Sequence, residues 1–194
     1  MFKQTNSHRS TRLIRLIAIA SAFSLSCSRQ PERKTTTQPK TAPVGSQTLT
    51  GRVVSIADGD TVTVLDSSDT QHRIRVAGID APESHQAFGE QSRQSLSGMI
   101  FGKDVTVNYH KIDQYGRLVA KIWLNGKDIN LEQVKAGMAW HYKFYQGEQT
   151  PEDRELYSKA EDEARSARRG LWRDPNPVEP SVFRKEERQE REAR

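Results

Sequence analysis

Residues 51–66 read GRVVSIADGDTVTVLD, in which two runs rich in β-branched residues are separated by Asp58-Gly59. Asp-Gly between two such runs is typical of a tight turn, so this stretch predicts a β-hairpin. Three more runs of similar length follow, HRIRVAGI from residue 72, VTVNYH from residue 105 and LVAKIWLNG from residue 118. We therefore expect five short strands.

Three stretches have helical patterns: QAFGEQSRQSLSGMIFG at 86–102, NLEQVKAGMAW at 130–140 and PEDRELYSKAEDEARSARRG at 151–170. In the first, Leu96, Met99 and Ile100 recur at helical spacing. Gly137 is a stop residue for the second, and Pro151 is a start residue for the third. Three strands, a helix, two strands and further helices predict an α+β fold, a five-stranded OB-fold β-barrel with an inserted helix and C-terminal helices.

The first 27 residues have a basic beginning without any acidic residue, followed by an apolar run at 13–25 and small residues. This order is typical of a signal peptide. The apolar run is shorter than the roughly 20 residues of a bilayer-spanning helix, which favours export over a permanent transmembrane anchor.

Cys27 is the only cysteine of the chain and directly follows the apolar run, which excludes an intramolecular disulfide. Its position suggests the lipidated N-terminal cysteine of a bacterial lipoprotein. However, Leu25 stands one position later than in such sites. Lipidation with attachment to the cell envelope, and plain cleavage with secretion, are both open alternatives.

The sequence divides into four parts. The signal peptide (1–27) is followed by a Pro-, Thr- and Lys-rich stretch at 28–47 that has no large apolar residue except Val44, as in a flexible linker. Residues 48–175 form the expected domain. The segment 176–194 is a charged tail, for which we expect a frayed helix or a disordered end rather than a binding arm.

The net charge of +5 belongs to the flanks of the chain. Residues 48–180 contain 17 Lys and Arg against 20 Asp and Glu, a net charge of −3. The basic isoelectric point is therefore no evidence for a nucleic-acid-binding body.

Three motifs carry the residues suited to chemistry: Asp58-Gly59-Asp60-Thr61, Arg75 with Asp80-Ala81-Pro82-Glu83, and Asp113-Gln114-Tyr115-Gly116-Arg117. Each motif alone is compatible with ordinary turn or loop residues. Their combination matters because all three fall at strand ends, which converge in a small barrel.

Together, the strings DGDTV, RVAGIDAPE and DQYGR resemble the thermonuclease (staphylococcal nuclease-like, micrococcal nuclease) family in order and separation, and the resemblance covers residues 50 to 173. It implies a hydrolase that cleaves phosphodiester bonds of DNA and RNA with little sequence preference and leaves 3′-phosphate ends. Calcium would be bound by Asp60, Asp80 and the carbonyl of Ala81. Arg75, Glu83 and Arg117 would be catalytic.

These assignments fit the chemistry of phosphodiester hydrolysis. Calcium prefers oxygen ligands and tolerates an open, irregular shell. Glu83 would take a proton from the attacking water, and the planar forks of Arg75 and Arg117 would bind phosphate oxygens. For substrate contacts we expect Tyr115 and then Tyr142.

Two other interpretations remain open: a non-catalytic OB-fold module that binds nucleic acid, and an adaptor domain of the cell envelope. Loss of one of the five site residues would favour the first, and the absence of calcium dependence and turnover would favour the second. All five are present in the sequence. No protein partner is implied, and we expect a monomer.

Overall fold

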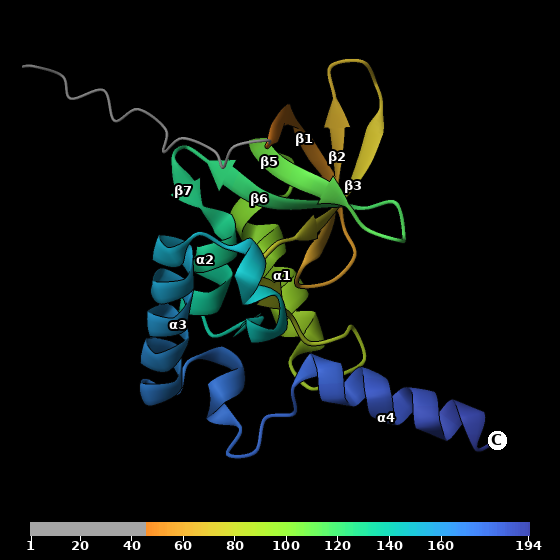
Figure 1. The fold of residues 1–194 in the computed structure, drawn as a ribbon, viewed down its shortest axis with the longest axis vertical. Coiled ribbons are helices and arrows are strands. Elements are labelled where there is room, and N and C mark those ends of the chain that lie inside the picture. The colour runs from red at the N-terminus through yellow and green to blue at the C-terminus, as the bar shows by residue number, and fades with distance from the viewer. Residues whose placement is uncertain (1–45) are drawn as a thin grey trace, which may run out of the picture. The chain divides into compact units, whose positions relative to one another are not determined.

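The computed structural model describes residues 46–194. The expected signal peptide with Cys27, and the linker up to residue 45, lie outside the described residues. Within residues 46–194, no helix has the length and apolar character needed to cross a membrane. The long strands of the main sheet, labelled in Figure 1, are β1 (Gln47–Ile56), β2 (Thr61–Asp66), β3 (Gln71–Val76), β5 (Asp104–Ile112) and β6 (Leu118–Leu124).

The five strands close into a barrel. Antiparallel pairs connect β3 to β2, β2 to β1, β1 to β5 and β5 to β6. A parallel pairing of β3 with β6, in which Ile74 is opposite Leu118, completes the ring. The alternating apolar residues of these strands point inward and are buried, as the fully buried Val53, Val64 and Ile122 illustrate.

Three helices cover one end of the barrel (Figure 1): α1 (Gly89–Ile100), α2 (Ile129–Lys135) and α3 (Pro151–Ser166). Leu96 and Ile100 of α1 are fully buried in the barrel core. Asp128 caps α2 by accepting a hydrogen bond from the amide of Leu131. Pro151 begins α3, at the position where its missing N–H costs no helical hydrogen bond.

Short elements complete the fold. Strand β7 (Lys127–Asp128) pairs with β6, and β4 (Ile79–Asp80) pairs with β8 (Trp140–His141), so that Asp80 is opposite Trp140. Two 3₁₀ segments, η1 (Lys143–Glu148) and η2 (Gly170–Arg173), follow β8 and α3. The small β4–β8 ribbon fixes Asp80 at the barrel rim, where it is buried.

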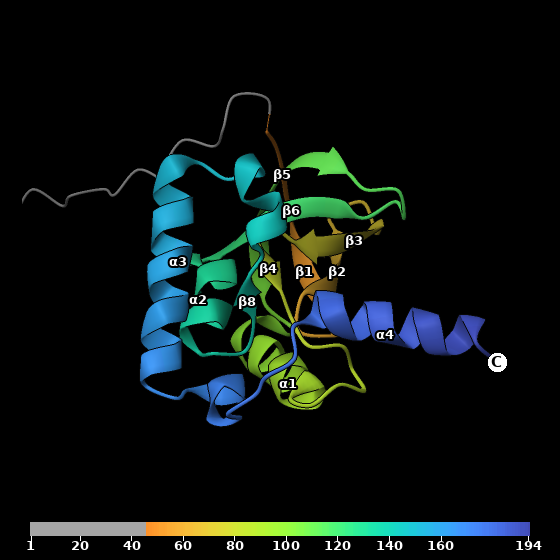
Figure 2. The same ribbon diagram turned by 60° about the horizontal axis from the view of Figure 1, so that its bottom comes forward.

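The last helix, α4 (Pro180–Glu192), extends from the body in Figure 2. Pro180 is its only buried residue. The charged tail is thus a helix of 13 residues, whereas the sequence left open a frayed helix or a disordered end.

The predicted fold class is confirmed. The structure is α+β, the barrel has five strands, α1 is inserted between the third and fourth barrel strands, and helices follow the last one. The first two barrel strands also confirm the hairpin at Asp58-Gly59.

Candidate active site

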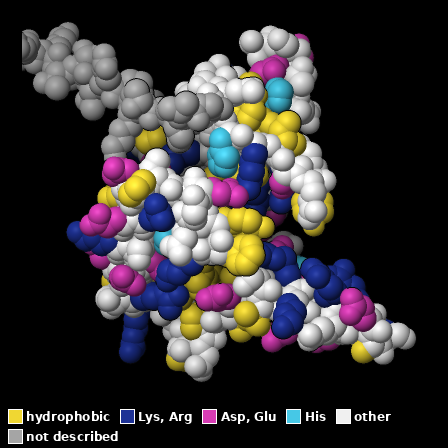
Figure 3. Space-filling view, viewed as in Figure 1, with side chains coloured by type: hydrophobic (Ala, Val, Ile, Leu, Met, Phe, Trp, Pro, Cys, Tyr) yellow, Lys and Arg dark blue, Asp and Glu magenta, His cyan; other side chains and the backbone are white. Residues whose placement is uncertain are grey.

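The three motifs meet at one end of the barrel, where a cleft of about 880 Å³ is lined by residues from the β1–β2 turn, the end of β3, the loop after β4 and the β5–β6 turn. Asp60, Arg75, Glu83 and Arg117 all line it. Figure 3 shows Lys and Arg side chains gathered along α4 beside this hollow. Five predicted residues thus fall within one region, because Asp80 is bonded directly to Arg75 there.

Asp60 is held by the tight turn between β1 and β2. The turn is fixed by Asp58, whose Oδ1 accepts the Asp60 amide hydrogen bond at 2.9 Å. Gly59 is required because a Cβ there would lie 1.8 Å from the Ser92 hydroxyl oxygen. Asp60 Oδ2 then accepts a hydrogen bond from the amide of Ala81 at 2.8 Å, which joins the first motif to the second.

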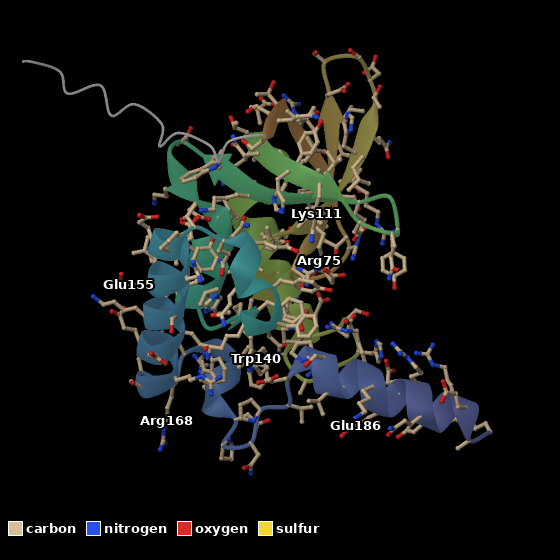
Figure 4. All side chains as sticks on the ribbon, viewed as in Figure 1. Arg75, Lys111, Trp140, Glu155, Arg168 and Glu186 are labelled. Atoms are coloured by element: carbon tan, nitrogen blue, oxygen red, sulfur yellow. The ribbon has the colours of Figure 1, made fainter. Side chains whose placement is uncertain are left out.

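Arg75 connects the two buried aspartates. Its Nη1 donates to the carbonyls of Val76 and Ile79 at 2.8 and 2.9 Å. Its Nη2 lies 3.0 Å from Asp80 and 3.2 Å from Asp60. Only 14% of the Arg75 side chain is exposed. Arg75 and Lys111, both labelled in Figure 4, lie on the barrel side of the cleft.

Arg117 lies at the start of β6 and is oriented by its own turn. Asp113 accepts hydrogen bonds from both the amide and the Nε of Arg117, at 2.9 and 2.8 Å. The guanidinium is also 5.4 Å from the ring centre of Tyr115 and 3.5 Å from the Thr61 hydroxyl. The Tyr115 side chain is exposed at the cleft edge. Arg117 itself lines the cleft, where a guanidinium can bind a phosphate oxygen.

Glu83 stands on the loop between β4 and α1. Gln86 stabilises this loop through two hydrogen bonds. Its side-chain Oε1 accepts from the Glu83 backbone amide at 3.1 Å, and its backbone amide donates to the Glu83 carbonyl at 2.9 Å. Gly89 allows the first turn of α1 to approach, because a Cβ there would lie 1.9 Å from the Glu83 carbonyl oxygen. The Glu83 side chain remains 29% exposed, so water can reach it.

Sequence reasoning missed one residue of this region. Arg184 of α4 donates from Nη2 to Asp80 at 2.9 Å and from Nη1 to Glu83 at 2.8 Å. No local pattern distinguishes it from the other charged residues of the tail. The contact bridges more than 100 positions of sequence, from residue 80 to residue 184.

The acidic side chains of the site lie close together, and this affects their protonation. Burial, followed by the nearby charge of Asp60, raises the pKa of Asp58 to about 6. Burial also raises the pKa of Asp80 to about 6, although the hydrogen bond from Arg184 opposes the shift. Negative charge is therefore costly here unless a cation compensates it.

The donor set is compatible with calcium. Asp60 and Asp80 supply carboxylate oxygens on adjacent chain segments, and Ala81, which is buried beside them, supplies a backbone carbonyl. The guanidinium groups of Arg75 and Arg184 form ion pairs with the Asp80 carboxylate, which shows that this carboxylate can bind positive charge. Within residues 46–194 there is no cluster of three or more His, Cys, Asp or Glu side chains suited to a metal. Carbonyl, water or phosphate oxygens would have to complete the shell.

Tyr142, the second predicted substrate contact, also lines the cleft. Its ring stacks on Phe144 with centres 6.3 Å apart and meets Tyr145 edge to face at 5.1 Å. Tyr145, which is not among the predicted substrate contacts, lines the same cleft. Phe144 is exposed, so the cluster offers ring faces to a ligand.

In a comparison with known protein families, residues 73–174 match the family described as staphylococcal nuclease homologue. That range contains Arg75, Asp80, Glu83 and Arg117, and begins after Asp60.

Individual relatives extend the similarity. An uncharacterized endonuclease of Haemophilus influenzae is 42% identical over 139 residues, which cover 72% of this chain and 75% of the relative. Protein ParB of Escherichia coli is 42% identical over 153 residues, covering 74% and 84%. The micrococcal nuclease of Shigella flexneri is 42% identical over 144 residues, covering 70% and 80%. The chain belongs to the staphylococcal nuclease family, and it is an endonuclease, a hydrolase of phosphodiester bonds.

Proposed function

We propose that this nuclease is calcium-dependent, cleaves both DNA and RNA with little sequence preference, and uses Glu83 as the general base. The observation that carries the proposal is the meeting of three groups in one cleft: the Asp60–Asp80 carboxylate pair, the water-accessible Glu83, and Arg117 on the opposite motif. Each group has a separate task in phosphodiester hydrolysis.

Glu83 accepts the proton of the attacking water at its carboxylate, for which its partial exposure is suited. Arg117 donates hydrogen bonds to the phosphate oxygens and stabilises the charge that develops in the transition state. Arg75 has the same role beside Asp80, with its fork oriented by the two backbone carbonyls. Calcium bound to Asp60, Asp80 and the Ala81 carbonyl would add positive charge next to the phosphate.

Recognition of nucleic acid would be local. The body of the domain has a net charge of −3 over residues 48–180, so it does not attract a polyanion as a whole. The exposed ring of Tyr115 and the partly buried ring of Tyr142 provide surfaces for stacking on bases. Stacking and phosphate contacts do not depend on base identity, which supports low sequence preference.

We also propose that the protein is exported, and either secreted or attached to the cell envelope through a lipid on Cys27. The support is the sequence pattern of residues 1–27. Growth with a clickable fatty acid separates the two locations. Label on the native chain and its loss in Cys27→Ser would support attachment, and an unlabelled mature protein would exclude it.

The main rival function is a binding module without catalysis. The presence of all five side chains, four of which line the cleft while Asp80 is bonded to Arg75 beside it, favours catalysis over binding alone. Glu83→Gln separates the two, because it keeps the shape of the side chain and removes its basicity.

We expect Glu83→Gln to lower the rate of cleavage of single-stranded DNA by about 100-fold or more while DNA binding persists. Glu90→Gln is the matched control, because Glu90 is exposed on α1 and pairs only with its helix neighbours Arg93 and Gln94. Unchanged turnover in Glu83→Gln would exclude Glu83 as the base.

A further inference from the structure

Helix α4 places a positive charge on the carboxylates that the proposed mechanism needs free. Arg184 contacts both oxygens of Asp80, with Nη1 3.2 Å from Oδ1 and Nη2 2.9 Å from Oδ2, and it also holds Glu83 through Nη1 at 2.8 Å. One guanidinium thus bridges a metal-ligand candidate and the general base. Since Arg75 binds Oδ1 from the other side, both Asp80 oxygens already have cationic partners.

Calcium and the Arg184 guanidinium cannot share this position. A calcium ion lies about 2.3 to 2.6 Å from its oxygen ligands. At that distance from Asp80 it would occupy the space of the guanidinium, and two positive groups would face each other at close range.

The attachment of α4 is of a kind that can be released. Beyond Arg184, the contacts of α4 with the loop that carries Glu83 are a pair between His85 and Glu187 at 2.6 Å and packing of His85 on Phe183. Just before the helix, Gln86 donates a hydrogen bond to the Val178 carbonyl at 2.7 Å. The His85 side chain is 58% exposed. Figure 2 shows the end of α4 extending away from the body. Few buried apolar contacts mean a low free energy of local opening.

We propose that α4 is a built-in competitor of the metal: Arg184 occupies the cation position of the active site, and calcium binds by displacing it together with the helix. This inference rests on the proposed calcium site. Competition between Arg184 and calcium would lower the calcium affinity, so that the nuclease becomes active only above a threshold calcium concentration.

Displacement of α4 would also widen the site. The first turn of the helix, through Pro180 and Ser181, lines a second cavity of about 390 Å³, whereas Arg184 and Arg188 line the larger cleft. Tyr142 lines both cavities, and Asp80 lines the smaller one. With α4 released, we expect the two cavities to join past Tyr142, and the longer groove can accept more nucleotides of a strand.

The test is calcium binding to the full chain, measured by isothermal titration calorimetry without substrate. We expect Arg184→Gln to bind calcium about tenfold more tightly than the native chain, which corresponds to about 1.4 kcal/mol. Deletion of residues 180–194 should have the same effect. Lys185→Gln is the control, since it removes an equal charge from an exposed neighbouring position, and its affinity should stay within about twofold of native because solvent screens that charge.

Hydrogen exchange measured by mass spectrometry adds a second readout. Calcium should accelerate exchange of the α4 amides in the native chain, and α4 amides that stay equally protected would contradict displacement. Equal affinities of the native chain and Arg184→Gln would overturn the competition but leave the calcium-dependent nuclease intact. A failure of every form to bind calcium would overturn the proposed function as well.

Discussion

Two arginines reach Asp80 from different regions, and they are held in different ways. Arg75 comes from the barrel, is 14% exposed, and is fixed by two backbone carbonyls as well as by Asp60 and Asp80. Arg184 comes from α4, is 36% exposed, and contacts only the carboxylates of Asp80 and Glu83. Both neutralise the same buried charge.

The difference distinguishes an arginine that is part of the fixed structure, Arg75, from one that a metal can displace, Arg184. The hydrogen bonds of Arg75 to main-chain carbonyls tie it to the path of the chain between β3 and β4, so it cannot leave without distorting the barrel rim. Arg184 has no such bond to the barrel. A site can therefore keep one cation as part of its structure and hold a second only until a metal replaces it.

The largest expected effect concerns stability. Arg75→Gln should lower the free energy of unfolding by about 3 to 5 kcal/mol, because it leaves the buried Asp60 without its cation and Asp80 with Arg184 alone. Arg184→Gln should lower it by less than about 1 kcal/mol, as expected for a partly exposed pair. Urea denaturation without calcium measures both. Equal losses would remove the distinction between the two arginines.

A slightly smaller effect, on the cleavage rate, is expected for a substitution of Arg117. Arg117→Gly should reduce cleavage by about 100-fold, because the variant loses a preorganised donor to the transition state. Circular dichroism should show an intact fold, since Arg117 is bonded mainly within its own turn. Single-turnover cleavage of DNA is the measurement, and a native rate would remove Arg117 from the mechanism.

The sequence could predict the barrel and its rim but not α4. The strands alternate locally, and DGDTV, RVAGIDAPE and DQYGR place Asp60, Arg75 and Arg117 at strand ends, whose meeting follows from barrel closure. The tail has five basic and four acidic residues in 14 positions. Its pattern allows a helix, but which charge contacts which partner depends on the path of the chain from α3 to α4.

For substitution of a proposed metal ligand we expect a smaller effect, on calcium affinity. Asp60→Ala should weaken calcium binding by about tenfold or more, in line with the loss of a group that orients or forms the metal shell. The effect should appear in calorimetry without substrate. An unchanged dissociation constant would exclude Asp60 as a ligand.

The smallest effect is expected far from the cleft, at a barrel turn. The hydrogen bond from His72, with backbone donors at Thr70 and Ser68, lowers the pKa of Asp66. A lowered pKa in the folded state stabilises the protein above the ordinary aspartate pKa, and this contribution is lost as the pH falls. Asp66→Asn should therefore lower the melting temperature more at pH 7 than at pH 3, without changing calcium affinity. An equal decrease in melting temperature at both pH values would contradict a contribution from the Asp66 charge.

The most direct measurement is cleavage of single-stranded DNA and RNA by the purified chain during a calcium titration, with a chelator as the zero point. The proposed function predicts hydrolysis of both polymers that appears with calcium and stops when the chelator is added. Hydrolysis that continues undiminished in the chelator, or binding without cleavage at saturating calcium, would contradict it.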